Sequence, residues 1–204
     1  RYTQILSDGL PLNGGQSGAL GPLQIPPMDL AQVEVIKGAA SALYGSTALG
    51  GVVNLISRRP EDERELLLNQ TTIDGADAVL WLADEVNEAW GYTLLGGLHR
   101  QSKADVDEDG WADVPGFRRG LLRPRVFWED GQGRSVFVTV GGMIEDREGG
   151  TLSGRTTPGG TSFPEELETR RIDAGLVGKV LFSGGRLLTV RGSTMAQRPD
   201  ALFG

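Results

Sequence analysis

Apolar and polar side chains alternate, one by one, along several long runs of this sequence. In one run, Ile172, Leu176 and Val180 fall on one side of the chain. Asp173 and Lys179 fall on the other side. A period of two residues gives a β-strand one apolar and one polar face. The sequence therefore predicts long strands over Gly120–Trp128, Ser135–Glu145, Arg171–Phe182 and Leu187–Gln197.

The connections between the predicted strands alternate in length. Antiparallel strands with short turns at one end and long loops at the other are typical of an outer-membrane β-barrel. The short turns are Val86–Glu88, Gly131–Gly133 and Gly184–Gly185, and the long polar loops lie around Lys103–Gly116 and Glu148–Glu168. Four aromatic side chains fall on the apolar faces beside the short turns, as in a girdle at a membrane interface: Trp90, Tyr92, Trp128 and Phe182.

A soluble antiparallel sandwich is the alternative, because its strands alternate in the same way. Strands of globular proteins average about 5–6 residues, whereas several of the runs here have ten or more. The polar faces also carry arginines, which suit a water-filled lumen better than the outer face of a sandwich. The pattern therefore favours a membrane barrel, and mainly β structure in either case.

Residues 1–60 differ from the rest, being rich in glycine and proline with only short apolar segments. Tyr2–Leu6 is predicted as a strand, Asp8-Gly9 as a turn and Asn13–Gly21 as a glycine-rich loop. A polar linker, PEDERE, follows at Pro60–Glu65. We therefore predict two domains, residues 1–60 and residues 61–204.

Composition excludes several classes of protein. The absence of cysteine and the single histidine, His99, exclude a disulfide framework and zinc sites of the Cys/His type. The net charge of −7 argues against a nucleic-acid partner. No run approaches the ~18 apolar residues of a membrane helix. The chain starts without Met in the middle of a pattern, so we expect an internal piece of a longer protein.

The stretch VEVIKGAASALYGSTALGGVVNLISRRP, Val33–Pro60, resembles the end of the plug domain of TonB-dependent outer-membrane receptors. RYTQILSDGLPL and LQIPPMDLAQ, upstream of it, are similar to earlier parts of the same domain. The resemblance implies that residues 1–60 are the C-terminal part of a mixed plug with a small sheet and short helices. Residues 61–204 would then be the first seven or so strands of an antiparallel transmembrane barrel of about 22 strands, and so incomplete. Arg58 and Arg59 would face the barrel wall and pair with its carboxylates.

The resemblance also implies a function. Such a receptor lies in the outer membrane of a Gram-negative bacterium, in contact with lipid, and imports a scarce small molecule when an inner-membrane TonB-type protein moves the plug. A ferric siderophore is the commonest ligand of the family. The sequence has neither a nucleophile elbow nor a phosphate-loop lysine, so we do not expect an enzyme. The alternative is a soluble, glycine-rich calcium-binding β-protein with an adhesion or binding role.

Two groups of residues are candidates for ligand contact. Asn13, Gln16 and Ser17 lie in the glycine-rich loop and could point into the vestibule as hydrogen-bond donors, or could simply be solvated. A basic stripe on the polar face of one strand could attract an anionic ligand, or could form salt bridges to the plug or the barrel wall. The stripe is Arg119, Arg123 and Arg125.

The sequence DVDEDGWAD has acidic residues at alternate positions followed by a glycine, in the order of a calcium loop. The bidentate glutamate is missing, because Gly116 occupies the twelfth position, and no helices are predicted around the loop. An EF-hand is therefore not expected, and a solvated acidic loop is the alternative to weak calcium binding. No other cofactor is required, and His99 is expected to be packed or hydrogen-bonded. The possible calcium ligands are Asp105, Asp107, Asp109 and Asp113.

Overall fold

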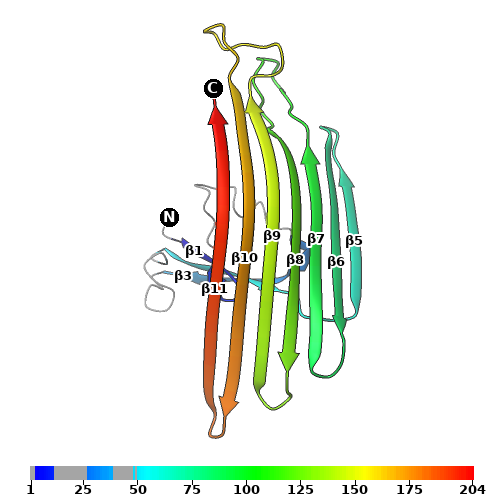
Figure 1. Ribbon diagram of the computed structural model, residues 1–204, viewed down its shortest axis with the longest axis vertical. Coiled ribbons are helices and arrows are strands. Elements are labelled where there is room, and N and C mark those ends of the chain that lie inside the picture. The colour runs from blue at the N-terminus through cyan, green and yellow to red at the C-terminus, as the bar shows by residue number, and fades with distance from the viewer. Residues whose placement is uncertain (1–2, 12–26, 39–47, 49) are drawn as a thin grey trace.

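The computed structural model describes residues 3–11, 27–38, 48 and 50–204, and it consists almost entirely of β-strands in two sheets. A tall, curved sheet of seven strands is crossed on one side by a small sheet of four (Figure 1). No helix in the described part of the chain is long and apolar enough to cross a membrane. The mainly β fold class predicted from the sequence is confirmed.

The large sheet is antiparallel throughout, and its strands lie side by side in chain order. This arrangement follows from the tight turns and loops, each of which joins neighbouring strands. The strands are β5 (Glu63–Gln70), β6 (Gly75–Glu85), β7 (Trp90–Gln101), β8 (Gly116–Glu129), β9 (Arg134–Gly150), β10 (Pro164–Phe182) and β11 (Arg186–Phe203).

Several strands are longer than the alternation predicted. The loop expected over Glu148–Glu168 is shorter, because β9 continues to Gly150 and β10 begins at Pro164. Backbone pairing of Gly149 with Glu165 extends the ladder into this polar region. Main-chain hydrogen bonds need no apolar face, so a strand can continue beyond its alternating part.

Every strand pair in the large sheet keeps the same parity, so even-numbered residues share one face. Leu98 lies opposite Gly120, Gly120 opposite Ile144, and Ile144 opposite Arg170. Odd-numbered residues such as Trp81 and Leu95 point toward the small sheet and are buried. The register therefore puts the even-numbered residues on one face, here called the outward face. The odd-numbered residues lie on the other face, which meets the small sheet and is here called the plug-facing side.

The small sheet has the order β2-β1-β4-β3, with β1 and β4 parallel and the other pairs antiparallel. Asp8 and Gly9 form the predicted turn with positive φ angles of 53° and 75°. The Asp8 carboxylate accepts hydrogen bonds from the backbone N and the Oγ of Ser57, at 2.9 and 2.6 Å. The elements are β1 (Thr3–Ser7), β2 (Leu10–Pro11), the 3₁₀ turn η1 (Pro27–Asp29), β3 (Leu30–Lys37) and β4 (Gly51–Ser57).

Apolar contacts join the two sheets. Trp81 and Leu95 lie in a buried cluster on the large sheet, and Met28 of η1 packs against it. Farther along, Leu10 of β2 lies directly over Gly175 of β10, where any side chain at position 175 would collide with it. The small sheet is thus seated on the plug-facing side at two separate points.

Candidate functional site

The candidate site is the boundary between the small sheet and the plug-facing side of the large one. Arg119, Arg123 and Arg125 point into this boundary because they are odd-numbered residues of β8. Each lies against a carboxylate. The structure therefore places the whole predicted basic stripe in ion pairs, as one of the two interpretations of the sequence expected.

Arg125 is the arginine that joins the two sheets. Its Nη2 lies 2.6 Å from Oδ2 of Asp29 in η1, and the side chains are 3% and 6% exposed. Removing two charges from water is costly, and the ion pair offsets that cost only while both partners are present. The Asp29–Arg125 pair is therefore a polar connection that depends on the small sheet staying seated.

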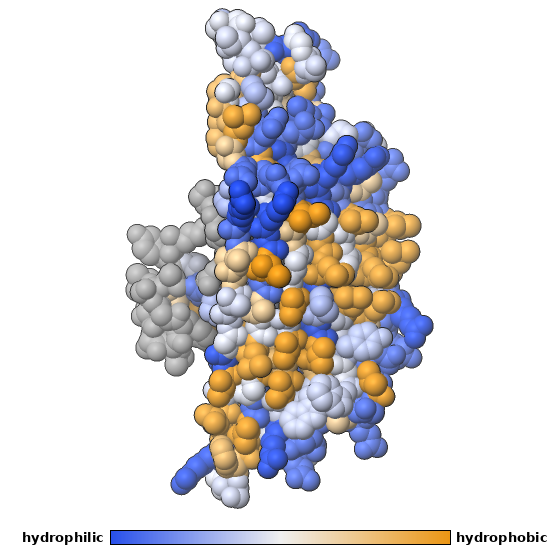
Figure 2. Space-filling model, in the orientation of Figure 1, coloured by the Kyte–Doolittle hydropathy of each residue, from blue (hydrophilic) through white to orange (hydrophobic). Residues whose placement is uncertain are grey.

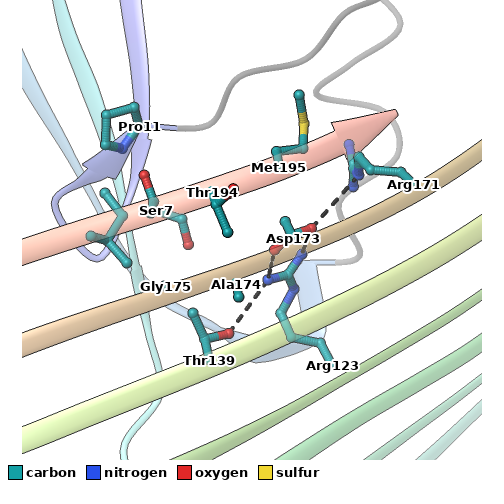
Figure 3. A pocket seen from close by; sticks show the side chains of 12 residues that line it. Ser7, Pro11, Arg123, Thr139, Arg171, Asp173, Ala174, Gly175, Thr194 and Met195 are labelled. Carbon is teal, nitrogen blue, oxygen red and sulfur yellow. Dashed lines mark hydrogen bonds and ion pairs between the residues drawn. The ribbon is translucent and has the colours of Figure 1, made fainter. Parts of the chain in front are cut away.

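Arg123 forms a two-pronged contact within the large sheet. Its Nη1 and Nη2 donate to the two carboxylate oxygens of Asp173 at 2.7 and 2.9 Å (Figure 3). Nη1 also lies 3.4 Å from Oγ1 of Thr139, and Arg171 approaches Asp173 from the other side at 3.8 Å. The guanidinium lies across Gly141, where a side chain would collide with it.

Arg119 belongs to a third, deeper cluster. Its Nε donates to Glu145, which is fully buried, and Arg147 lies 3.3 Å from the same carboxylate. Two arginines thus share one glutamate on the plug-facing side. Glu145 was missed as a site residue, although its position on the polar side of a predicted strand was visible in the sequence.

The spaces along the boundary are small. The cavity in Figure 3 has a volume of about 40 Å³ and is lined by Ser7 and Leu10 from the small sheet and by Arg123 and Asp173 from the large one. A second cavity of about 40 Å³ lies beside Asp29 and Arg125. Such volumes suit one or a few water molecules. A ligand the size of a metal chelate does not fit in either of these two cavities.

A larger cavity, of about 270 Å³, opens between the small sheet and the ends of β8 to β10 that carry the short turns. Its lining includes both acidic and basic groups, among them Asp8, Glu34, Arg59, Glu129 and Lys179. Because the charges are mixed, this cavity favours neither an anion nor a cation.

Arg58 and Arg59 pair with carboxylates of the large sheet, as predicted. Arg58 donates to Glu63 and, at 2.5 Å, to Glu65, and its guanidinium lies 5.2 Å from the ring of Trp81. The hydrogen bond to Glu65 raises the pKa of Arg58 above its ordinary value. Arg59 lies 3.9 Å from Glu129, with both side chains largely exposed. Arg58 thus fixes the end of the small sheet to the start of the large one.

The other predicted residues lie away from these ion pairs. Asn13, Gln16 and Ser17 fall outside the described residues, so their ligand role stays a prediction. His99 is hydrogen-bonded, as expected, with its Nδ1 2.8 Å from Oδ1 of Asp77.

The acidic loop brings three of its four aspartates together. Asp105, Asp107 and Asp109 each have a carboxylate oxygen within 4.8 Å of the others. Asp113 instead accepts a hydrogen bond from the backbone N of Val106 at 2.8 Å. Asp105 and Asp109 also accept backbone hydrogen bonds, from Gly110 and Trp111 at 2.8 and 2.7 Å. The carboxylates therefore stabilise the loop by hydrogen bonds to its own backbone. Calcium binding stays a prediction.

Comparisons with known proteins give this geometry a context. The family model described as the TonB-dependent receptor plug domain matches residues 1–52. The ferrioxamine receptor of Yersinia enterocolitica is 30% identical over 149 residues, which cover 72% of this chain and 19% of that protein. The ferric enterobactin receptor PirA of Pseudomonas aeruginosa is 31% identical over 123 residues, covering 52% of this chain and 17% of the relative. The chain thus spans about a fifth of the length of the curated relatives it matches.

Solved structures share the fold over nearly the whole chain. The siderophore receptor PirA from Pseudomonas aeruginosa superposes with a TM-score of 0.67 at 24% identity, covering 99% of this chain and 34% of that one. The ferric yersiniabactin uptake receptor FyuA from Yersinia pestis gives a TM-score of 0.72 at 17% identity, covering 99% and 33%. The family match, the relatives and the plug-like sheet seated on barrel-type strands lead to one conclusion: the chain belongs to the TonB-dependent receptors.

Proposed function

We propose that the receptor containing this chain imports a ferric siderophore across the outer membrane of a Gram-negative bacterium, by energised movement of its plug. The named relatives are receptors for ferrioxamine and ferric enterobactin, which supports an iron chelate as the ligand. The TonB-dependent receptors are transporters and not an enzyme family. An inner-membrane protein of the TonB type would supply the energy, and membrane lipid would surround the barrel.

The observation that carries the proposal is how closely the small sheet fits the wall. The cavities beside Arg123 and Arg125 hold about 40 Å³ each, so a chelate passing this boundary requires the plug to move. Movement would separate Leu10 from Gly175 and Asp29 from Arg125. The first contact is apolar and the second is a buried ion pair, so the two resist separation for different physical reasons.

Ligand binding is tested with the complete receptor in detergent. We expect saturable quenching of tryptophan fluorescence by one ferric siderophore, with no response to its metal-free form. Gln16→Ala and Arg123→Gln should weaken this binding if the predicted residues contact the ligand. Arg186→Gln removes an exposed arginine far along the chain and serves as the control. A response to cobalamin or an oligosaccharide, with silence toward every iron chelate, would keep the family and overturn the iron ligand.

Plug movement is tested with a reversible crosslink. The chain has no cysteine, so Leu10→Cys with Gly175→Cys would introduce one thiol on each sheet at a point of direct contact. We expect the oxidised double variant to bind the siderophore but not to import radioactive iron into cells, and reduction to restore import. The two single-cysteine variants are the controls. Normal import by the oxidised protein would contradict plug movement at this boundary.

The prediction of weak calcium binding by Asp105, Asp107 and Asp109 has a separate test. Terbium substitutes for calcium, and Trp111, two residues after Asp109, could sensitise its emission. We expect terbium emission that calcium displaces and that Asp107→Asn weakens. Equal emission from wild type and variant would identify the loop as a solvated acidic segment.

A further inference from the structure

Four of the arginines on the outward face of the large sheet form a group away from the plug and from the ion pairs described above. They are even-numbered and exposed, and they lie toward the ends of their strands that carry the long loops. This group, here called the outer arginine row, consists of Arg100, Arg118, Arg170 and Arg198.

Within the outer arginine row, like charges face each other across neighbouring strands. Arg100 is directly opposite Arg118, and Arg170 is directly opposite Arg198. Like charges in this position repel each other unless an anion lies between them. The side chain of Arg118 makes no ion pair or hydrogen bond with any other described residue, although Asp146 is its cross-strand neighbour.

The other three arginines have acidic neighbours at the surface. Arg170 contacts Glu168, Arg198 lies 3.5 Å from Asp200, and Arg100 lies 3.9 Å from Asp74. All these side chains are well exposed, and exposed pairs of this kind contribute little. A phosphate, which arginine binds with two parallel hydrogen bonds, can compete with them.

Two apolar grooves lie directly beside the outer arginine row. One has a volume of about 670 Å³, with Leu68, Leu98 and Ile144 as walls and Arg100 and Arg118 at its rim. The other has a volume of about 620 Å³ and is lined by apolar and small residues, with Arg170 and Arg198 at its rim. Asp146 is the only outward-facing acidic residue among the described residues that line either groove. Figure 2 shows this face, with an apolar orange band across its middle and hydrophilic blue side chains above it.

The floors of the grooves are made by residues with little or no side chain. Gly120 contributes to both, Ala76 and Ala78 to the first, and Gly142 and Ala196 to the second. Nothing lies within 4 Å of the position that a Cβ would take at Gly142. The backbone is thus open to an apolar chain that lies along the sheet.

We propose that the outer arginine row and the two grooves bind a phosphorylated membrane lipid, with the phosphate on the arginines and the acyl chains in the grooves. Arginines lie at the border of the apolar band, among acidic residues such as Glu168 and Asp200, and they could receive the anionic headgroup of a lipid at the edge of the hydrocarbon layer. A free phosphate would use only the arginines and leave the grooves empty. The site lies on the opposite face from the plug, so its failure would leave the proposed import of a siderophore untouched.

The headgroup contact is tested by native mass spectrometry of the complete receptor in detergent. We expect dioleoyl phosphatidic acid to be retained in preference to dioleoyl phosphatidylcholine. The double variant Arg118→Gln/Arg170→Gln should bind the acidic lipid about 10-fold more weakly, since it loses two charge-assisted contacts. Arg64→Gln/Arg186→Gln removes two arginines from the other ends of β5 and β11 on the same face and should bind normally. Equal retention of the two lipids, or equal loss in both double variants, would overturn the proposal.

The acyl contact needs a variant that leaves the charges unchanged. Gly142→Leu fills one groove, whereas Gly96→Leu adds the same side chain on the same face outside both grooves. We expect only Gly142→Leu to weaken binding of the long-chain acid, and neither variant to change binding of dihexanoyl phosphatidic acid. Complete displacement of the lipid by excess inorganic phosphate, with no effect of Gly142→Leu, would identify a free-anion site and reject the lipid.

Discussion

The two faces of the large sheet are built from the same strands but hold their charged residues in opposite ways. On the plug-facing side, Arg125 and Glu145 are buried and each lies against an opposite charge. On the outward face, the middle of the sheet is apolar and exposed, with side chains such as Val140 and Ile172. The charges of that face lie toward the strand ends.

The difference shows what each face is in contact with. On the plug-facing side each arginine of the basic stripe has a carboxylate within the chain: Asp29 from beside the small sheet for Arg125, and Glu145 and Asp173 from the large sheet itself for Arg119 and Arg123. The outward face has no such partner among the described residues, and the hydrocarbon layer of the proposed membrane would offer none, so charges in the middle of this face would remain unpaired. The alternation along each strand therefore puts charged residues, which have ion-pair partners within the protein, on one face. It puts apolar residues, which need no such partner, in the middle of the other face.

Breaking the Asp29–Arg125 pair should have the largest effect. Asp29→Asn leaves Arg125 buried without its carboxylate, and we expect a loss of about 3–5 kcal/mol in the free energy of unfolding. The measurement is denaturant unfolding of the complete receptor in detergent. Glu129→Gln breaks the exposed pair with Arg59, at 3.9 Å, and should cost at most about 1 kcal/mol. Similar losses from the two variants would mean that burial does not distinguish these pairs.

A charge placed in the outward apolar band should have the next largest effect. Val140→Lys puts an ammonium group where the side chain is now 43% exposed and apolar, and a cost of about 2–4 kcal/mol is expected near the middle of a bilayer. Ser135→Lys, on the same strand but on the plug-facing side, lies between Glu129 and Lys179 of the neighbouring strands. Attraction to one and repulsion from the other should nearly offset, so stability should change by about 0.5 kcal/mol or less. The two variants are compared by unfolding in lipid vesicles. Equal stability would refute the assignment of the faces.

The sequence could predict the strands where alternation was strong, but not where they end. β9 was expected to stop at Glu145 and β10 to begin at Arg171, whereas they extend to Gly150 and from Pro164. Beyond the apolar band both faces are polar, so the pattern loses its period although the backbone ladder continues. The chemistry of the side chains carries no information about the strand in that region.

The sequence could predict that the arginines at the boundary between the sheets form ion pairs, but not which distant carboxylate each of them contacts. Arg58 and its partners Glu63 and Glu65 lie within seven residues, and pairing with the wall was expected. Arg125 and Asp29 are 96 residues apart, and nothing in the sequence around Asp29 identifies this aspartate as the partner. The seating of one sheet on the other brings them together, and that arrangement depends on the whole fold.

Glycine positions give a matched test of the two faces within β10. Gly175→Leu should collide with Leu10 and cost about 1–3 kcal/mol, because the small sheet must shift to make room. Gly178→Leu places the same side chain on the outward face, where nothing lies within 4 Å, and should be close to neutral. Unfolding of both variants in detergent provides the comparison. A neutral Gly175→Leu would mean that the contact between Leu10 and Gly175 does not hold the plug in place.

The smallest effect is expected in a short turn, outside both faces. The Asp130 carboxylate accepts hydrogen bonds from the backbone N of Arg134 and of Gln132, at 2.9 and 2.8 Å, and the bond from Arg134 chiefly lowers the pKa of Asp130. Because the pKa is lower in the folded turn than in the unfolded chain, the carboxylate stabilises the fold above the ordinary aspartate pKa of about 3.9, and this contribution is lost as the pH falls through the folded value.

Asp130→Asn should therefore lower the melting temperature slightly at neutral pH, and the difference from wild type should vanish in acid. Asp62→Asn removes an exposed carboxylate that accepts no hydrogen bond from any described residue, and it should show no such pH-dependent difference. Melting curves of the three proteins from neutral to acidic pH give the comparison. A difference that grows in acid would show that the carboxylate destabilises the turn, and would reverse the sign of the linkage. A difference in melting temperature confined to neutral pH would show that the charge of Asp130 stabilises the turn, although the turn lies outside both faces of the sheet.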